Sequence, residues 1–131
     1  MNNLVLGRGV GQSLFIGRNI QPKRAVETCD LRIMLKGLYS LKKSSVALVL
    51  ITEHEGTMEI ALSEGHKNPV EIGEVKFWFK GTKSYEVDER NCTRCGAEQD
   101  GKKVLQNGLF RLNAPAETQI FRGNRIGRNA R

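Results

Sequence analysis

The sequence lacks the features that mark membrane and secreted proteins. No apolar stretch in its 131 residues approaches the roughly 20 residues that a membrane-spanning helix needs. The opening residues, MNNLVLGRGVGQ, contain no signal-peptide-like apolar segment. Cysteine occurs three times, and an odd count does not suit a small disulfide-built domain. We therefore expect a cytoplasmic protein (in the host cytoplasm if phage-encoded) of one domain, or of one domain with an insertion.

Acidic residues are scarce at both ends of the chain. The net charge is +7, from 21 Lys and Arg against 14 Asp and Glu. Residues 1–20 carry two arginines and no acid, and residues 108–131 carry five arginines and one acid, so the ends hold six of the seven net charges. Arginine presents a planar fork of donors that suits phosphates and guanine edges. This pattern indicates a nucleic-acid partner, with a solvated basic surface as the alternative.

The hydrophobic pattern predicts a chain built mainly of β-strands with one helix. Apolar runs at 4–6 and 14–16 flank a glycine-rich turn, and residues 45–63 have the pattern of a hairpin. Residues 31–41 place Leu and Met at helical spacing, so a helix is expected there. Further strands are expected at 75–80, at 85–87 as its partner across Gly81, at 109–112 and at 118–121.

Two segments near the ends carry recognisable motifs. The run LVLGRGVGQSLFIG resembles the opening of the CsrA/RsmA family of bacterial post-transcriptional regulators, which has the form L-x-L-x-R followed by V-G-[EQ]-[ST]-[LI]-x-I-G. The run RLNAPAETQIFR is similar to the second signature of that family, N-A-P-x-[ED]-x-x-[VI]-x-R. The two signatures occur in the correct order and cover about 45 residues.

The resemblance implies a CsrA-like homodimer with interleaved β-sheets, in which the first strand of one chain pairs with the last strand of the other. RNA with GGA in a hairpin loop would lie along that edge, in an mRNA leader or a small RNA. The matching positions are Leu4, Leu6 and Arg8 on the first strand and Ile120 and Arg122 on the last. Alternation along each strand puts Leu4, Leu6 and Arg8 on one face, and Ile120 and Arg122 on another. Exposed edge arginines that merely discourage aggregation are the alternative.

The sequence also departs from the family pattern. Gly7 and Gly9 stand where the family has Thr and often a basic residue, and Phe121 stands where His is frequent. Gly123 replaces a common acid, and Pro22 falls where the second strand should run. Arginines of the C-terminal tail, Arg125 first among them, are expected to compensate through phosphate contacts.

The family has no counterpart for most of the centre of the chain. We expect residues 21–107 to form an inserted α+β subdomain, with a CsrA-like half made of 1–20 plus 108–131. Within it, Cys92 and Cys95 have the C-x-x-C-G spacing of half a zinc site. A redox pair and a plain loop with two thiols remain the alternatives, so no cofactor is required.

Three functions compete at this point. The first is an RNA-binding translational regulator, not an enzyme. The second is a protein-interaction module that pairs with or antagonises a cellular CsrA-like regulator. The third is a zinc-dependent nucleic-acid enzyme, for which the sequence offers no nucleophile and base in a recognisable pairing.

Overall fold

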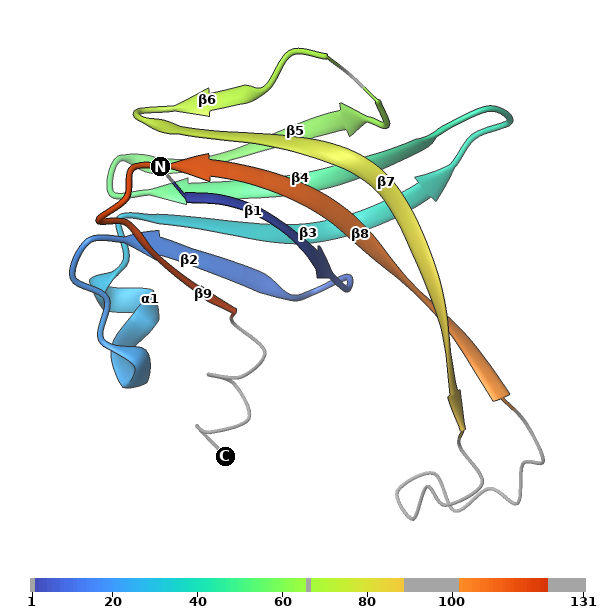
Figure 1. The fold of residues 1–131 in the computed structure, drawn as a ribbon, viewed down its shortest axis with the longest axis horizontal. Coiled ribbons are helices and arrows are strands. Elements are labelled where there is room, and N and C mark those ends of the chain that lie inside the picture. The colour runs from blue at the N-terminus through green and yellow to red at the C-terminus, as the bar shows by residue number, and fades with distance from the viewer. Residues whose placement is uncertain (1, 66, 89–101, 123–131) are drawn as a thin grey trace.

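Two antiparallel β-sheets pack face to face in the computed structural model, which describes residues 2–65, 67–88 and 102–122 (Figure 1). One sheet has the strand order β1-β8-β7-β6 and the other has the order β5-β4-β3-β2-β9. The prediction of a mainly β chain is therefore confirmed. The elements are β1 (Asn2–Arg8), β2 (Ser13–Gly17), η1 (Pro22–Arg24), α1 (Ala25–Thr28), β3 (Leu31–Ser40), β4 (Ser45–Glu53), β5 (Gly56–Ser63), β6 (Val70–Ile72), β7 (Val75–Asp88), β8 (Lys102–Ala114) and β9 (Gln119–Arg122).

Strands from the two ends of the chain enter different sheets. β1 pairs along its whole length with β8, from Asn2 opposite Ala114 to Arg8 opposite Gly108. β2 instead lies between β3 and β9 in the second sheet. The chain crosses between the sheets at Gly11, whose φ of +87° favours glycine and whose N–H donates to the Leu35 carbonyl at 2.7 Å. The sequence correctly predicted a strand, a turn and a strand here.

The core lies between the inner faces of the sheets, where apolar residues alternate with exposed ones along each strand. On β4, for example, Ala47, Val49 and Ile51 are each at most 1% exposed, while the residues between them are partly accessible. This alternation confirms the hairpin predicted at 45–63, in which β4 pairs with β5. The largest fully buried side chains are Phe77, Leu14, Ile16, Leu35, Ile51, Leu112 and Val49.

The helix predicted at 31–41 is wrong, because this segment is strand β3. Leu31, Ile33 and Leu35 alternate toward the core with period two. The register with β4 then shifts between Leu35 and Gly37, which leaves Lys36 as one extra residue. After this bulge Leu38 returns to the core side, three residues beyond Leu35. A bulge in a strand thus produced the spacing that is typical of a helix.

The predicted pairing of 75–80 with 85–87 across Gly81 is also wrong. Both segments belong to one strand, β7, which pairs throughout with β8. The register shifts between Phe79 and Gly81, and Gly81 has a φ of +136°, so the glycine marks a bulge and not a reversal. Beyond it the paired β7 and β8 continue past the sandwich as a two-stranded ribbon (Figure 1).

Strands of the central segment 21–107 share both sheets with strands of the two ends. β3 pairs with β2, and β7 pairs with β8, which itself contains residue 108. In the described part of 21–107 the helical residues are limited to η1 and α1. The division into a CsrA-like half, 1–20 plus 108–131, and an inserted α+β subdomain stays a prediction.

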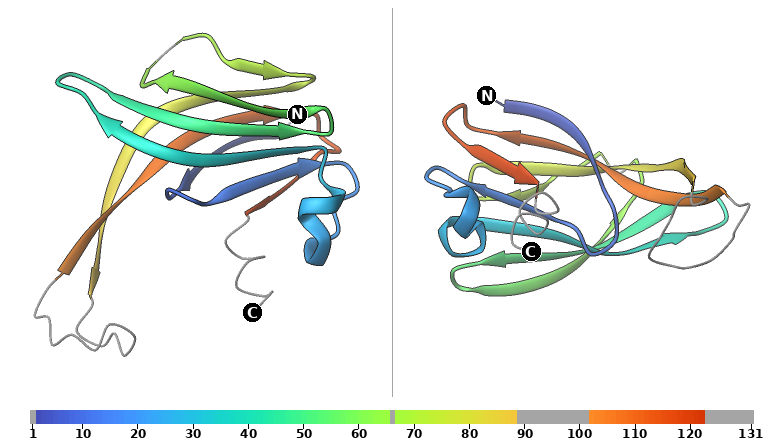
Figure 2. Two further views of the ribbon diagram at one scale, coloured as in Figure 1. Left: turned by 180° about the vertical axis from the view of Figure 1, so that it is seen from behind. Right: turned by 90° about the horizontal axis from the view of Figure 1, so that it is seen from below.

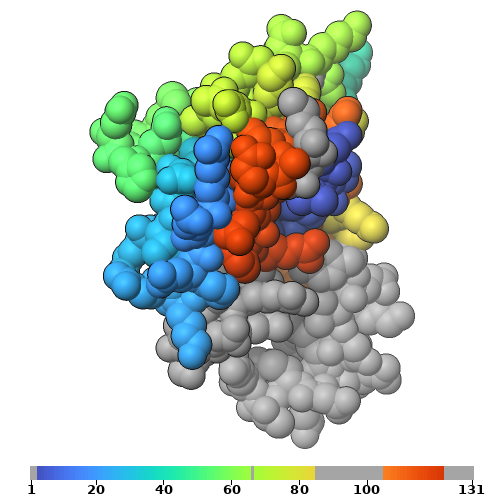
Figure 3. Space-filling model, turned by 60° about the vertical axis from the view of Figure 1, so that its left-hand side comes forward, coloured from blue at the N-terminus to red at the C-terminus, as the bar shows by residue number. Residues whose placement is uncertain are grey.

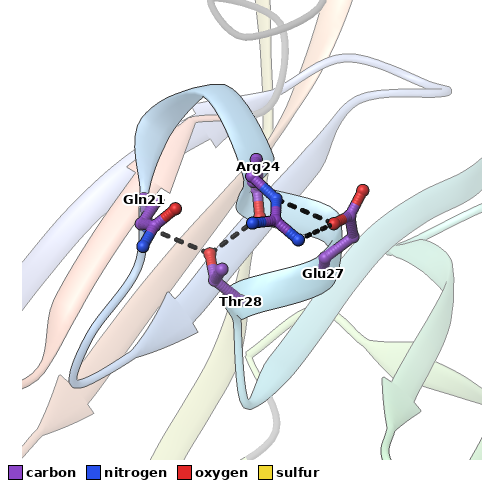
Figure 4. Close-up of polar contacts among 4 residues, drawn as sticks. All are labelled: Gln21, Arg24, Glu27 and Thr28. Atoms are coloured by element: carbon purple, nitrogen blue, oxygen red, sulfur yellow. Dashed lines mark hydrogen bonds and ion pairs between the residues drawn. The ribbon is translucent and has the colours of Figure 1, made fainter.

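A small helical corner covers the outer side of β2 (Figure 2). Pro22, predicted to displace a strand, is the first residue of η1 in this corner. Figure 4 shows its polar contacts: the Thr28 hydroxyl donates to the Arg24 carbonyl at 2.7 Å and accepts from the Gln21 N–H at 2.9 Å. Arg24 also pairs with Glu27 at 2.6 Å. The corner carries a second apolar cluster, which consists of Phe15, Ile20, Ala25 and Cys29 with Phe121 packed against it.

Cys29 in this cluster is expected to be chemically protected. It is 8% exposed, and burial raises the pKa of its thiol. Because the thiolate is the reactive form, we expect iodoacetamide at pH 8 to modify Cys29 at least about tenfold more slowly in the folded protein than in urea. Peptide mapping by mass spectrometry over time measures both rates. Equal rates would show that the corner opens freely.

Candidate functional site

The first and last described strands form neighbouring edges on one side of the sandwich. β1 ends the order of its sheet and β9 ends the order of the other. Figure 3 shows the red surface of the last strand beside the dark-blue surface of β1. Leu6 of β1 belongs to the core cluster against which Ile120 of β9 packs, so both strands turn their inner faces to the same core. Within the described residues, each of these strands has one hydrogen-bonded neighbour, and its outer edge is unpaired.

The apolar residues predicted for this site differ in accessibility. Leu6 is 7% exposed and belongs to the core, opposite Phe110. Leu4 lies on the same face of β1 but is 42% exposed. Ile120 is half-buried. Leu4 and Ile120 are therefore the apolar side chains here that a ligand can touch.

Arg8 points into the molecule. Only 5% of it is exposed, and its guanidinium donates to the carbonyls of Gly7 at 2.8 Å and Ser13 at 3.4 Å. Burial, and then the positive charge of Arg122, lower the pKa of Arg8 from its usual value. These contacts tie the end of β1 to the start of β2, so Arg8 holds the edge in place and contributes positive charge from beneath it.

Arg122 is exposed at the end of β9, opposite Leu14 of β2. The carbonyl of Ser13, the residue before Leu14, accepts from the Arg8 guanidinium at 3.4 Å, so the two predicted arginines, 114 positions apart in the sequence, reach adjacent positions of β2. The charge of Arg122 also contributes to the lowered pKa of Arg8. Among the described residues, no acid forms an ion pair with Arg122. The resemblance implied that these arginines meet across two chains, and their role at an RNA edge stays a prediction. Of the two, Arg122 is the one whose side chain is exposed.

Two departures from the family pattern have packing reasons. The side chain of Asn107, on β8, lies over β1, and a Cβ at Gly7 or Gly9 would approach it to 3.3 Å. The Gln12 side chain also accepts from the Gly9 N–H at 2.8 Å. At the other edge, Phe121 packs on the helical corner. Gln12 stands at the [EQ] position of the first signature, whereas sequence reasoning missed Asn107, because its contact with β1 depends on the register of β1 with β8.

Three predicted site residues lie outside the described residues. They are Arg125, Cys92 and Cys95, and their proposed roles stay predictions. Within the described ranges, no group of three or more His, Cys, Asp or Glu side chains is arranged to hold a metal ion. No helix in those ranges is long and apolar enough to cross a membrane.

Comparison with known proteins adds no relative to this picture. No protein-family model matches the sequence, and no curated protein and no solved structure does so either. What the edge formed by β1 and β9 does is therefore inferred from its own residues: one exposed arginine beside a buried one, and two accessible apolar side chains.

Proposed function

We propose that this protein is an RNA-binding translational regulator of the CsrA/RsmA kind, which works in the cytoplasm and recognises GGA-containing hairpin loops in mRNA leaders or small RNAs. One observation carries the proposal: exposed Arg122 of β9 lies opposite Leu14, and the carbonyl of the preceding residue, Ser13, accepts from the Arg8 guanidinium, on the two edge strands that also carry Leu4 and Ile120. Unstacked RNA bases rest on apolar side chains while arginine and backbone donors read their edges. The proposed site needs no metal and no catalytic group.

A second copy of the chain is the partner that we propose for the open edges. The outer edges of β1 and β9 offer unpaired backbone donors and acceptors among the described residues. Pairing of β1 in one chain with β9 in another would satisfy both edges and give two equivalent RNA sites. This is the interleaved homodimer that the family resemblance implies.

A gel-shift titration tests the proposed function. The probe is a short hairpin with GGA in its loop, and the control is the same hairpin with the triplet scrambled, each at low and at physiological salt. We expect at least about tenfold tighter binding to GGA, since each wrong base at a specific contact costs about 1–3 kcal/mol. Equal and steeply salt-dependent binding to both hairpins would mean that the basic charge alone attracts RNA.

A second candidate function fits the same open edges. They can accept a strand from a short CsrA-like protein, which would make this chain an antagonist of a cellular regulator. The burial of Arg8 and the glycine at position 9 favour this alternative, because both reduce the positive surface at the RNA edge. It predicts weak RNA binding, together with heterodimers recovered when a tagged short CsrA-like protein is used for a pull-down.

A further inference from the structure

An aromatic and basic surface lies on the outer face of the β1-β8-β7-β6 sheet, away from the core. Trp78 of β7 is directly opposite Arg111 of β8, which is opposite Val5 of β1. The Arg111 guanidinium carbon lies 5.2 Å from the centre of the Trp78 ring. The Arg111 Nε also donates to Asn3 Oδ1 at 3.1 Å, which fixes the plane of the guanidinium. This cross-strand row therefore holds two planar groups, the Trp78 indole and the Arg111 guanidinium, in a fixed orientation.

A cavity of about 280 Å³ opens beside this stacked pair. Lys67, Lys80 and Arg111 contribute three positive charges to its lining, and none of its described lining residues is acidic. The Trp78 Nε1–H donates to the Lys67 carbonyl at 3.2 Å, which attaches the loop after β5 to the ring. The described lining residues are Gly65, Lys67, Trp78, Phe79, Lys80 and Arg111.

Two described carboxylates of the neighbouring segments, Glu71 and Glu64, have partners of their own. Glu71 pairs with Lys76 at 3.6 Å. Glu64, which a Cβ at Gly81 would approach to 3.0 Å, accepts from the Ser45 N–H at 3.0 Å. Neither of these carboxylates is among the described lining residues, so the three cations of the cavity favour an anionic ligand.

We propose that this cavity, the Trp78 pocket, binds a nucleotide of single-stranded RNA. Aromatic rings and guanidinium planes stack bases of any sequence, while neighbouring cations hold the phosphates. A phosphate alone would need the cations but not the indole. The inference rests on the proposed RNA-binding function, which it extends from the hairpin loop to the nucleotides that flank the hairpin.

Geometry links the Trp78 pocket to the edge formed by β1 and β9. β1 supplies Leu4 to that edge and Val5 to the outer face of its sheet. From β1 to β7 is two strand spacings, or about 10 Å. An RNA bound along β1 can therefore continue across the outer face to Trp78. The pocket would add affinity without adding sequence preference.

Tryptophan fluorescence tests this directly, because Trp78 is the only tryptophan in the chain. The probes are the GGA hairpin without overhangs, the same hairpin with a six-nucleotide single-stranded extension, and inorganic tripolyphosphate. We expect the extension to tighten binding and to quench Trp78, and tripolyphosphate to leave the fluorescence unchanged. Trp78→Ala and, separately, Lys80→Gln should each weaken binding of the extended hairpin by at least about fivefold and leave the minimal hairpin unaffected.

Two matched controls separate the pocket from general effects. Tyr39→Ala removes an aromatic side chain, 53% exposed, from the other sheet, and Lys43→Gln removes an equal charge from the turn between β3 and β4. Both should bind the extended hairpin as the unaltered protein does. Far-ultraviolet circular dichroism of Trp78→Ala checks that it folds, and Lys80→Gln provides an independent result if it does not.

The outcomes distinguish this inference from the proposed function. If the minimal hairpin binds selectively but neither Trp78→Ala nor Lys80→Gln weakens binding of the extended hairpin, the inferred nucleotide site in the Trp78 pocket is wrong. The proposed regulator function is then still supported. If Lys80→Gln alone weakens binding and the fluorescence does not change, only charge acts there and the stacking site is wrong. If GGA selectivity is absent while single-stranded RNA quenches Trp78, the pocket is supported and the proposed regulator fails.

Discussion

Replacing Arg122 with alanine is expected to weaken binding of the GGA hairpin by about tenfold to a hundredfold. Arg122 is exposed on edge strand β9 and is unpaired with any acid of the described residues, so its donors are available to RNA. An arginine that contacts a base contributes about 1–3 kcal/mol. Arg8 cannot replace it, because its side chain is buried and donates to two carbonyls. A gel-shift titration of both proteins measures the change.

Two further variants show which part of Arg122 matters. Arg122→Lys keeps the charge but loses the planar fork, so it should keep general RNA affinity and lose much of the preference for GGA. Lys43→Ala removes the same charge from the turn between β3 and β4 and should have little effect. A loss of affinity in Lys43→Ala as large as in Arg122→Ala would place recognition in the net charge and not at this edge.

Replacing Phe77 with alanine is expected to destabilise the fold by about 3–5 kcal/mol. Phe77 is 1% exposed and is the largest of the fully buried side chains. Its neighbours across the sheet are Leu112 and Val70, and the facing sheet closes over the same cluster. Removal of the ring leaves a cavity that paired strands on both sides cannot close. Urea unfolding followed by circular dichroism gives the difference in the free energy of unfolding.

The matched control for this change is Val26→Ala in α1. Val26 is 62% exposed, so its truncation should alter stability by no more than about 0.5 kcal/mol. A loss for Phe77→Ala below about 1 kcal/mol would contradict a core packed between the two sheets. Such a result would mean that other side chains move into the cavity left by the Phe77 ring.

The strands were predictable where apolar and polar residues alternate without interruption. On β4 the alternation spans the whole strand, and the hairpin with β5 follows from it. On β3 and β7 a bulge inserts one residue and shifts the alternation. The bulge at Lys36 gave the apolar residues a helix-like spacing. Gly81 suggested a turn, but in the structure it has a positive φ and marks a bulge. A bulge is fixed by the register with a neighbouring strand, which the local sequence does not contain.

The site was predictable as far as its two signature segments reach. They indicated Arg8 and Arg122 as members of one edge between two chains, and within the single chain Arg8 contacts Ser13 while Arg122 lies opposite the next residue, Leu14. The burial of Arg8 was not predictable, because it depends on the Ser13 carbonyl at the start of the next strand. The stacking of Arg111 on Trp78 was missed for a similar reason. The two residues are 33 positions apart and meet only through the register of β7 with β8.

The long sequence separation between paired end strands determines when the molecule can finish folding. β1 pairs with β8, and β2 with β9, across about 100 residues of intervening chain. At about 5–20 residues per second, a ribosome needs seconds to supply the missing partners. During that time β1 has no strand to pair with and leaves Leu4, Val5 and Leu6 open to chaperones or to aggregation. Arg8 and Arg122 likewise come together only after residue 122 has been made, so chains interrupted earlier carry β1 without β9 and lack the site that we propose for RNA.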